Sequence, residues 1–501
     1  MKNKTGVCRA LLLVGMGLMI PCYLFTAGNT LLSPWPLYDR NRLALCLLTP
    51  LCLLLLLLLG RAAKAKVFET HERAVLLGFA AFYFVIQLVM ASALRFTPVT
   101  DLEQCVTAAR RLAQTGAFGD SERSLIYFGR YPHNMGLVYL LAGIFKAADA
   151  LGADELMAAA LVCGLLFSMG LLCAARLCRR LGGAQAQARA LLLFATCLPF
   201  LYCTSELYTD AFSVAFAPMI VFAFLKARDA GSRKERSLWA LLFAVCTFFG
   251  AQIRFPTIIA AIACLIAALF EKRAKLTALL AAPLALVFAV GGSAVNAANE
   301  ANLGAANIAQ NKLPKLHYIA MGLPVQSDEG YGQYGYGGWL IFSTSFDDPQ
   351  ARNEALRQEV IDRAYTLARH PAQLLSTLSR KNLSTFGRGT FNLNEIFEAD
   401  AHEADNAVKQ AVFENGRFNR AYTHLATAMF VAQMALACIA CIQAIRRRDT
   451  RAAPLFLTLL GAFLFLSIWE TRARYFFQFM MILLCAGAMF ETPSTHAAQK
   501  A

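Results

Sequence analysis

Apolar runs of about 20 residues recur along the chain and are separated by polar segments. Thirteen such runs are present, at 7–28, 40–60, 73–95, 134–150, 155–175, 188–206, 208–226, 238–253, 255–270, 276–295, 421–445, 453–469 and 475–491. A helix of this length crosses a hydrocarbon core about 30 Å thick, and in lipid a spanning segment must satisfy its own backbone hydrogen bonds. The pattern therefore predicts an all-α polytopic membrane protein with about 12–13 transmembrane helices.

Composition supports the same class, because 58% of the 501 residues are hydrophobic and only 16% are charged, against about a quarter charged in soluble domains. The net charge of +15 does not indicate a nucleic-acid partner, because the cations cluster at the ends of apolar runs, as the positive-inside rule describes. These clusters are Arg61–Lys66, Arg176–Arg180, Lys226–Arg236, Lys272–Lys275 and Arg446–Arg451. The expected partner is the lipid bilayer.

The cysteines predict neither disulfides nor a metal site. Nearly all of the fifteen lie inside apolar runs, where cysteine behaves as a small hydrophobic residue, and only Cys105 lies in a long polar loop. The acidic run Glu398–Asp405 contains metal-ligand residue types, but we interpret it as an exposed acidic helix start. We expect no metal and no cofactor.

The charge pattern also orients the chain. With the basic clusters inside, Asp101, Asp210 and a long loop fall on the extracytoplasmic side. The two halves of the chain disagree by one crossing, and the conflict lies within residues 134–175. The two apolar stretches there must make one net crossing or hide a third. One of them could be re-entrant or lie in the interface, and the sequence does not choose between these alternatives.

We expect three parts: a transmembrane module at 1–295 with a first outer loop at 96–133, a large extracytoplasmic loop domain at 296–420, and C-terminal transmembrane helices at 421–501. In the first loop, Asp101 is placed to cap an amphipathic helix that stops at Gly116. Its apolar stripe predicts a helix on the membrane surface. In the second loop, Asp348-Pro349 predicts a helix start and His370-Pro371 its end.

Four short motifs occur in a characteristic order: Thr100-Asp-Leu-Glu-Gln104 with a helix ending at Gly116, then Arg130-Tyr-Pro-His-Asn134, then Tyr208-Thr-Asp210, and finally Arg474-Tyr475. This layout resembles the GT-C glycosyltransferases, in particular the protein O-mannosyltransferases and the bacterial aminoarabinose transferases of lipid A. The sequence departs from that pattern where Leu102 follows Asp101 and where Tyr131-Pro replaces Pro-Pro.

The resemblance implies an inverting transfer of a sugar from a polyprenyl-phosphate donor to an acceptor hydroxyl on a glycan, lipid or protein. Asp101 is the candidate general base, and Asp210 has a catalytic or acceptor-orienting role. Arg254, Arg472 and Arg474, with Tyr475, are candidates to hold the donor phosphate. The candidates for sugar or acceptor binding are Glu103, Tyr127, Arg130, His133, Asn134, Tyr334 and Trp339.

Simpler interpretations stand beside these. Asp101 and Asp210 also suit helix caps, Arg254 an interfacial anchor, and Arg472 and Arg474 an ion-pair network with Glu470. Two other functions fit the general layout: an O-antigen ligase or polymerase, and a lipid or polysaccharide flippase. A flippase should carry charges deep within its spans, whereas here they concentrate at span ends. The expected location is a bacterial cytoplasmic membrane, with the site on the outer face.

Overall fold

The computed structural model describes residues 2–35, 41–94, 97–119, 121–326, 329–393, 406–413 and 416–491, and for residues 2–5 the backbone alone. Within these ranges the chain forms helices and no strands. The acidic run 398–405 lies outside the described residues.

Eight helical segments in the described chain are long and apolar enough to cross a membrane, and three shorter apolar helices accompany them. The eight are α1 (Lys2–Leu32), α2 (Arg42–Ala62), α4 (Glu72–Ala93), α8 (Glu155–Ala195), α9 with α10 (Thr209–Ser213, Phe216–Asp229), α11 (Arg233–Ile253), α13 (Ala274–Leu303) and α20 (Asn419–Arg446). The shorter ones are η4 with α12 (Phe255–Thr257, Ile258–Phe270), α21 (Ala453–Ile468) and η6 with α22 (Ala473–Phe479, Met480–Ala488). The all-α polytopic class predicted from the sequence is confirmed.

The 41-residue helix α8 is two antiparallel arms. At 1.5 Å per residue a straight helix of this length would span about 60 Å, twice the hydrocarbon core. The helix breaks at Gly182 and Gly183, and Gly183 has a φ of +74°, which glycine adopts without steric cost. The rings of Phe167 and Phe200 lie 5.1 Å apart, so the chain has returned to the level of Phe167 by Phe200. Residues 155–175 and 188–206 are therefore two crossings.

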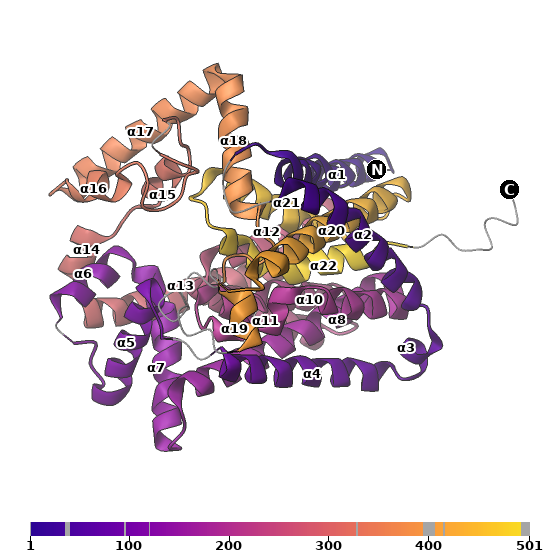
Figure 1. Cartoon of the computed structure of the whole chain (residues 1–501), viewed down its shortest axis with the longest axis horizontal. Coiled ribbons are helices and arrows are strands. Elements are labelled where there is room, and N and C mark those ends of the chain that lie inside the picture. Colours follow the sequence, from indigo (N-terminus) through magenta and orange to yellow (C-terminus); the bar gives the residue numbers. More distant parts are fainter. Residues whose placement is uncertain are drawn as a thin grey trace, which may run out of the picture.

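Helix α7 (Met135–Ala150) accounts for the disagreement of one crossing between the two halves of the chain. It runs across the direction of α4 rather than alongside it (Figure 1). Leu137, Val138 and Leu141 are fully buried, and α7 packs against α5 and α8. One face of the stretch 134–150 is therefore buried against protein, and because α7 runs across the direction of the spans we do not count it as a crossing. With α8 counted as two arms and the three shorter apolar helices included, the described chain has twelve candidate crossings.

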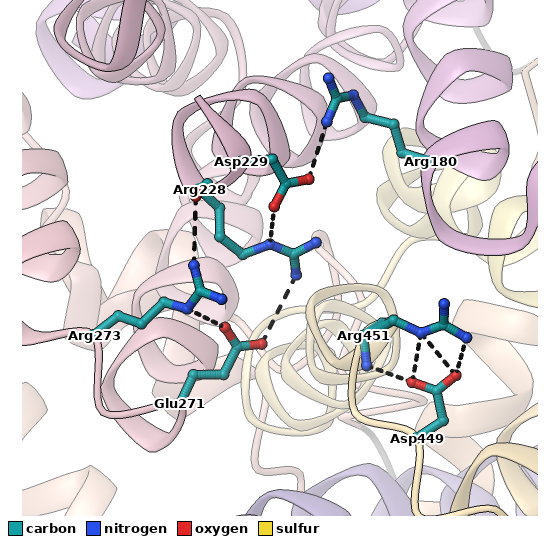
Figure 2. Close-up of polar contacts among 7 residues, drawn as sticks. All are labelled: Arg180, Arg228, Asp229, Glu271, Arg273, Asp449 and Arg451. Carbon is teal, nitrogen blue, oxygen red and sulfur yellow. Dashed lines mark hydrogen bonds and ion pairs between the residues drawn. The ribbon is translucent and has the colours of Figure 1, made fainter. Parts of the chain in front are cut away.

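The basic ends of several spans meet on one side of the molecule, shown in Figure 2. Asp229 at the end of α10 pairs with Arg180 of α8 at 3.0 Å, and Glu271 after α12 pairs with Arg273 at 3.2 Å. Arg451 and Asp449 form a further pair in the loop between α20 and α21. We call this side the inner face, following the positive-inside rule, and the opposite side the outer face.

The short α3 (Lys66–Thr70) lies on the inner side, at the right of Figure 1, and the remaining helices gather at the outer face, at the left. They are α5 (Thr100–Thr115), α6 (Glu122–Arg130), α14 (Ala305–Asn311), α15 (Lys315–Met321), α16 (Trp339–Thr344), α17 (Pro349–Arg369) and α18 (Pro371–Phe386), and the short α19 (Ala407–Val412) precedes α20. Asp348 caps α17 by accepting from the Gln350 and Ala351 amides at 3.0 and 3.1 Å, which confirms the predicted helix start.

Helix α5 ends at Gly116, with a φ of +71°, as the sequence predicts. Two details differ from the expectation. The N-cap is Val99, so Asp101 lies inside the first turn and does not cap the helix. Leu102, Cys105, Val106 and Ala109 of the apolar stripe are buried and Leu112 is partly buried. The helix packs on α7, so its apolar stripe is covered by protein rather than by the membrane surface.

Candidate active site

Asp101 lies among tyrosine hydroxyls at the outer face. Tyr127 of α6 donates a 2.7 Å hydrogen bond to its Oδ1, and the Tyr208 hydroxyl lies 3.5 Å from its Oδ2. Asn134 donates in turn to the Tyr127 oxygen at 3.0 Å. Burial, with Tyr208 and Asp101 nearby, raises the pKa of Tyr127, so this hydroxyl keeps its proton and acts as a donor to the carboxylate.

The backbone is strained immediately before two of these residues. Thr100, which precedes Asp101, has a φ of +53°, and Leu207, which precedes Tyr208, has a φ of +49°. β-branched and bulky residues rarely adopt this left-handed region, and such strain persists where the surrounding structure fixes it, often at functional sites. The strain turns two distant segments so that their side chains meet.

A cavity of about 420 Å³ opens beside Asp101. Its lining combines carboxylates, guanidinium groups and tyrosines, namely Thr100, Asp101, Glu103, Gln104, Arg123, Ile126, Tyr127, Arg130 and Tyr131. The space is large enough for a sugar-sized group and contains the polar groups that would orient one.

Asp210 is completely buried at the start of the α9–α10 span and lies between two arginines. Its Oδ1 is 2.9 Å from Arg254 Nε, and its Oδ2 is 3.4 Å from Arg474 Nε. Arg254 also donates to Thr209 Oγ1 at 2.7 Å. The carboxylate therefore fixes the positions of both guanidinium groups, which come from the ends of different spans.

Aromatic rings connect these two groups of residues. The Arg474 guanidinium lies 5.4 Å from the centre of the Tyr208 ring, and the Arg254 guanidinium lies 4.3 Å from that of Tyr475. Tyr475 also donates a hydrogen bond to Glu470. Since the hydroxyl of Tyr208 reaches Asp101, a continuous series of contacts joins Asp101 to the arginines.

The Gly/Tyr-rich turn of the second outer loop covers the adjoining segment. The Thr471 amide donates to Gly332 O and its hydroxyl to Tyr331 O, both at 2.8 Å, while Arg472 donates to Tyr334 O at 3.3 Å. The Tyr334 and Tyr131 hydroxyls lie 2.7 Å apart. Arg472 thus holds the turn, and Tyr334 reaches a residue that lines the Asp101 cavity.

The other sequence candidates occupy three kinds of position. Glu103 and Arg130 line the cavity. His133 is exposed, with its ring 6.1 Å from that of Tyr131. Trp339 is buried against Met321 in a small separate core, where Arg363 stacks on its ring. That environment gives Trp339 a packing role in the outer helices.

Sequence reasoning did not select Tyr131, Tyr208, Glu470 and Lys381 as site residues. Tyr208 stands in a motif whose carboxylate, Asp210, is the more evident candidate, and the sequence alone indicates Glu470 only as an ion-pair partner of Arg472 and Arg474. Burial raises the pKa of the Glu470 carboxyl, against an opposing effect of Tyr475 and the arginines. No local pattern distinguishes Lys381, because its partners lie about 60 and 90 residues away in the sequence.

The fold and the span pattern define a multi-pass α-helical membrane protein. The chain belongs to a family described as conserved hypothetical integral membrane proteins, whose sequence model matches residues 42–495. No curated protein matches the chain. Among solved structures it is similar to the crystal structure of ArnT from Cupriavidus metallidurans bound to undecaprenyl phosphate, with 15% identity and a TM-score of 0.35, over 85% of this chain and 78% of that one.

Proposed function

We propose that this protein is a membrane glycosyltransferase that moves a sugar from a polyprenyl-phosphate donor to an acceptor hydroxyl. The observation that carries the proposal is the connection of Asp101, through Tyr208, to Arg474 and Asp210. A carboxylate beside a sugar-sized cavity and guanidinium groups at the outer ends of spans are the two parts that such a reaction needs. The sequence layout shared with GT-C glycosyltransferases supports the same reaction.

In the proposed reaction, the acceptor oxygen attacks the anomeric carbon of the donor sugar. The bond between that carbon and the phosphate oxygen breaks, and the acceptor proton passes to the Asp101 carboxylate. Tyr127 donates to Oδ1 of Asp101, which orients the carboxylate and leaves further lone pairs to accept the proton. The single displacement inverts the configuration at the anomeric carbon.

The leaving group is a polyprenyl phosphate, and its oxygen gains negative charge as the bond breaks. Arg254 and Arg474 are positioned to stabilise that charge, since guanidinium groups match the geometry of phosphate oxygens. Together with Asp210 they have a formal charge of +1, so the group attracts an anion even with its internal carboxylate. In this scheme Asp210 positions the arginines and does not accept the proton.

The sugar would lie between these two centres. Tyr131, Tyr334 and Asn134 offer hydroxyl and amide groups, and His133 an exposed ring, which suit hydrogen bonding and stacking with a carbohydrate. The acceptor is a glycan, lipid or protein. The proposed location is a bacterial cytoplasmic membrane with the site on its outer side.

The depth of the carboxylates favours transfer over transport. Asp101 lies in α5, outside the spanning helices, and Asp210 stands at the outer end of the Thr209–Asp229 span. A flippase would be expected to place its ionisable groups near the middle of the bilayer. This position supports chemistry at the membrane surface.

The test uses membranes from cells that produce the full chain. These are incubated with radiolabelled undecaprenyl-phosphate sugars, one sugar at a time, and the labelled product is separated and identified. We expect label to move to a new molecule with wild-type membranes and not with Asp101→Asn membranes. The exposed inner-face variant Lys275→Met serves as a matched control and should transfer normally. If no sugar in the panel is transferred, or if Asp101→Asn transfers at the wild-type rate, the proposal is wrong.

A further inference from the structure

Lys381 of α18 is buried in the outer part of the molecule, with 1% of its surface exposed. Its ammonium group donates to two backbone carbonyls: that of Gly322, at the end of α15, and that of Trp469, at the end of α21, the latter at 2.7 Å. A buried lysine is unusual and costly unless its charge is compensated. The position therefore calls for a reason beyond packing.

The two carbonyls belong to parts of the chain that must be held together. Gly322 approaches the backbone of residues 468–469 so closely that a Cβ atom would collide with it. The rings of Tyr318 and Trp469 stack at 5.1 Å. Lys381 therefore joins the end of α15, among the outer helices, to the segment that follows α21 by hydrogen bonds to both.

That segment, residues 469–475, contains the proposed donor site. It includes Arg474 and Tyr475, and its path is fixed by the bonds of Thr471 to the Gly/Tyr-rich turn. Glu470, in the same segment, is near enough to act electrostatically on both Lys381 and Arg474, and it accepts a hydrogen bond from Tyr475. Loss of the Lys381 hydrogen bond to Trp469 O would therefore free the start of the segment that contains Arg474.

We propose that Lys381 is a positioning residue that aligns the segment 469–475, and with it Arg474 and Tyr475, for binding the lipid phosphate. This inference rests on the proposed function. A methionine would fill the same space without a buried charge, but it would leave the Gly322 and Trp469 carbonyls without their donor and would no longer join the two chain segments. Alignment of the segment gives a reason for a lysine at this position.

The experiment measures binding of undecaprenyl phosphate to the full chain in nanodiscs, by native mass spectrometry, for the wild type and for Lys381→Met, Lys381→Arg and Lys275→Met. We expect Lys381→Met to bind about tenfold more weakly, a loss of the size of one hydrogen bond. Lys381→Arg, which keeps the charge and the donors, should recover part of the affinity. Lys275→Met should bind as the wild type does. Equal affinity of Lys381→Met and the wild type would overturn the inference.

A second variant covers the case in which Lys381→Met does not fold. Thr471→Val keeps the shape of the side chain and the lysine but removes the bond to Tyr331 O. It loosens the same segment, so we expect a smaller loss of affinity in the same direction, and an unchanged affinity would count against the inference. If the wild-type protein itself does not bind undecaprenyl phosphate, the proposed function fails instead. The two failures are therefore distinguishable.

Discussion

The Tyr127 hydroxyl donates a 2.7 Å hydrogen bond to Asp101 Oδ1, and this contact separates the two explanations of Asp101. A capping carboxylate would accept from the amides of its own helix, whereas this one accepts from a side chain of another helix. The contact also fixes the direction in which the second oxygen points. Asp101 therefore does not cap α5, and we propose that this contact orients it as the general base.

The first prediction concerns this pair. Asp101→Asn should lower the transfer rate by about 10² to 10⁴-fold, the range for loss of a general base, because the amide cannot accept the proton. Tyr127→Phe should lower it by less, since the carboxylate remains but is less well oriented. Initial rates with a labelled polyprenyl-phosphate sugar test both. If Tyr127→Phe lost more activity than Asp101→Asn, Asp101 would not be the residue that accepts the proton.

The second prediction concerns Arg474. Arg474→Ala removes one of the two guanidinium groups beside Asp210 but leaves the pair of Asp210 with Arg254, at 2.9 Å. We expect weaker binding of undecaprenyl phosphate and a smaller loss of thermal stability than in Asp210→Asn, because the buried carboxylate keeps one of its two arginine partners. Titration in nanodiscs measures the binding. An unchanged affinity would mean that the donor phosphate is bound elsewhere.

The third prediction concerns Asp210, whose loss should act mainly on the fold. Asp210→Asn leaves Arg254 and Arg474 close together and largely buried, and removal of one partner from a buried ionic group costs about 3–5 kcal/mol. Thermal unfolding should show a lower midpoint. Undecaprenyl phosphate should restore more stability to this variant than to the wild type, because a phosphate replaces the lost negative charge. Equal stabilisation of both proteins would argue against phosphate binding at this position.

Hydropathy predicts the spans well because length and apolar content are what a bilayer requires, and Asp348-Pro349 predicts the start of α17 because capping is local. Local sequence does not determine whether residues 134–150 cross the membrane. Their sequence is equally apolar whether lipid or protein surrounds them, so only the packing of α7 on α5 and α8 decides. The site follows the same rule: the motifs indicate Asp101 and Asp210, whereas Tyr208 reaches Asp101 across 107 residues of sequence, a pairing that no local pattern encodes.

The fourth prediction tests the course of α7. If α7 does not cross, both of its ends lie at the outer face. Leu151, just after its C-terminal end, is 82% exposed, so Leu151→Cys should react with a membrane-impermeant maleimide added outside intact spheroplasts. Ser121→Cys in the first outer loop should react in the same way, and Lys275→Cys should react only after permeabilisation. If Leu151→Cys reacted only after permeabilisation, α7 would cross the membrane and the prediction would be wrong.

The last prediction concerns the dependence of stability on pH. Burial lowers the pKa of Lys381 from 10.5 to about 7, partly opposed by Glu470. Between these two values the unfolded chain binds a proton that the folded chain does not, so the free energy of unfolding from this group rises with pH. The group adds no slope below about pH 7, where both states are charged. Stability contributed by Lys381 should therefore be lost as pH falls from 10.5 toward 7.

Thermal midpoints at pH 7.5 and 9 measure this effect in Lys381→Met, in the control Lys275→Met and in the wild type. The midpoint of the wild type should rise relative to that of Lys381→Met over this interval, while Lys275→Met should follow the wild type, because Lys275 is exposed. Parallel curves for the wild type and Lys381→Met would show that Lys381 keeps its proton in the folded protein. In that case its ammonium would be held charged by Glu470 and the two carbonyls throughout the range, since a proton retained by both states contributes no dependence on pH.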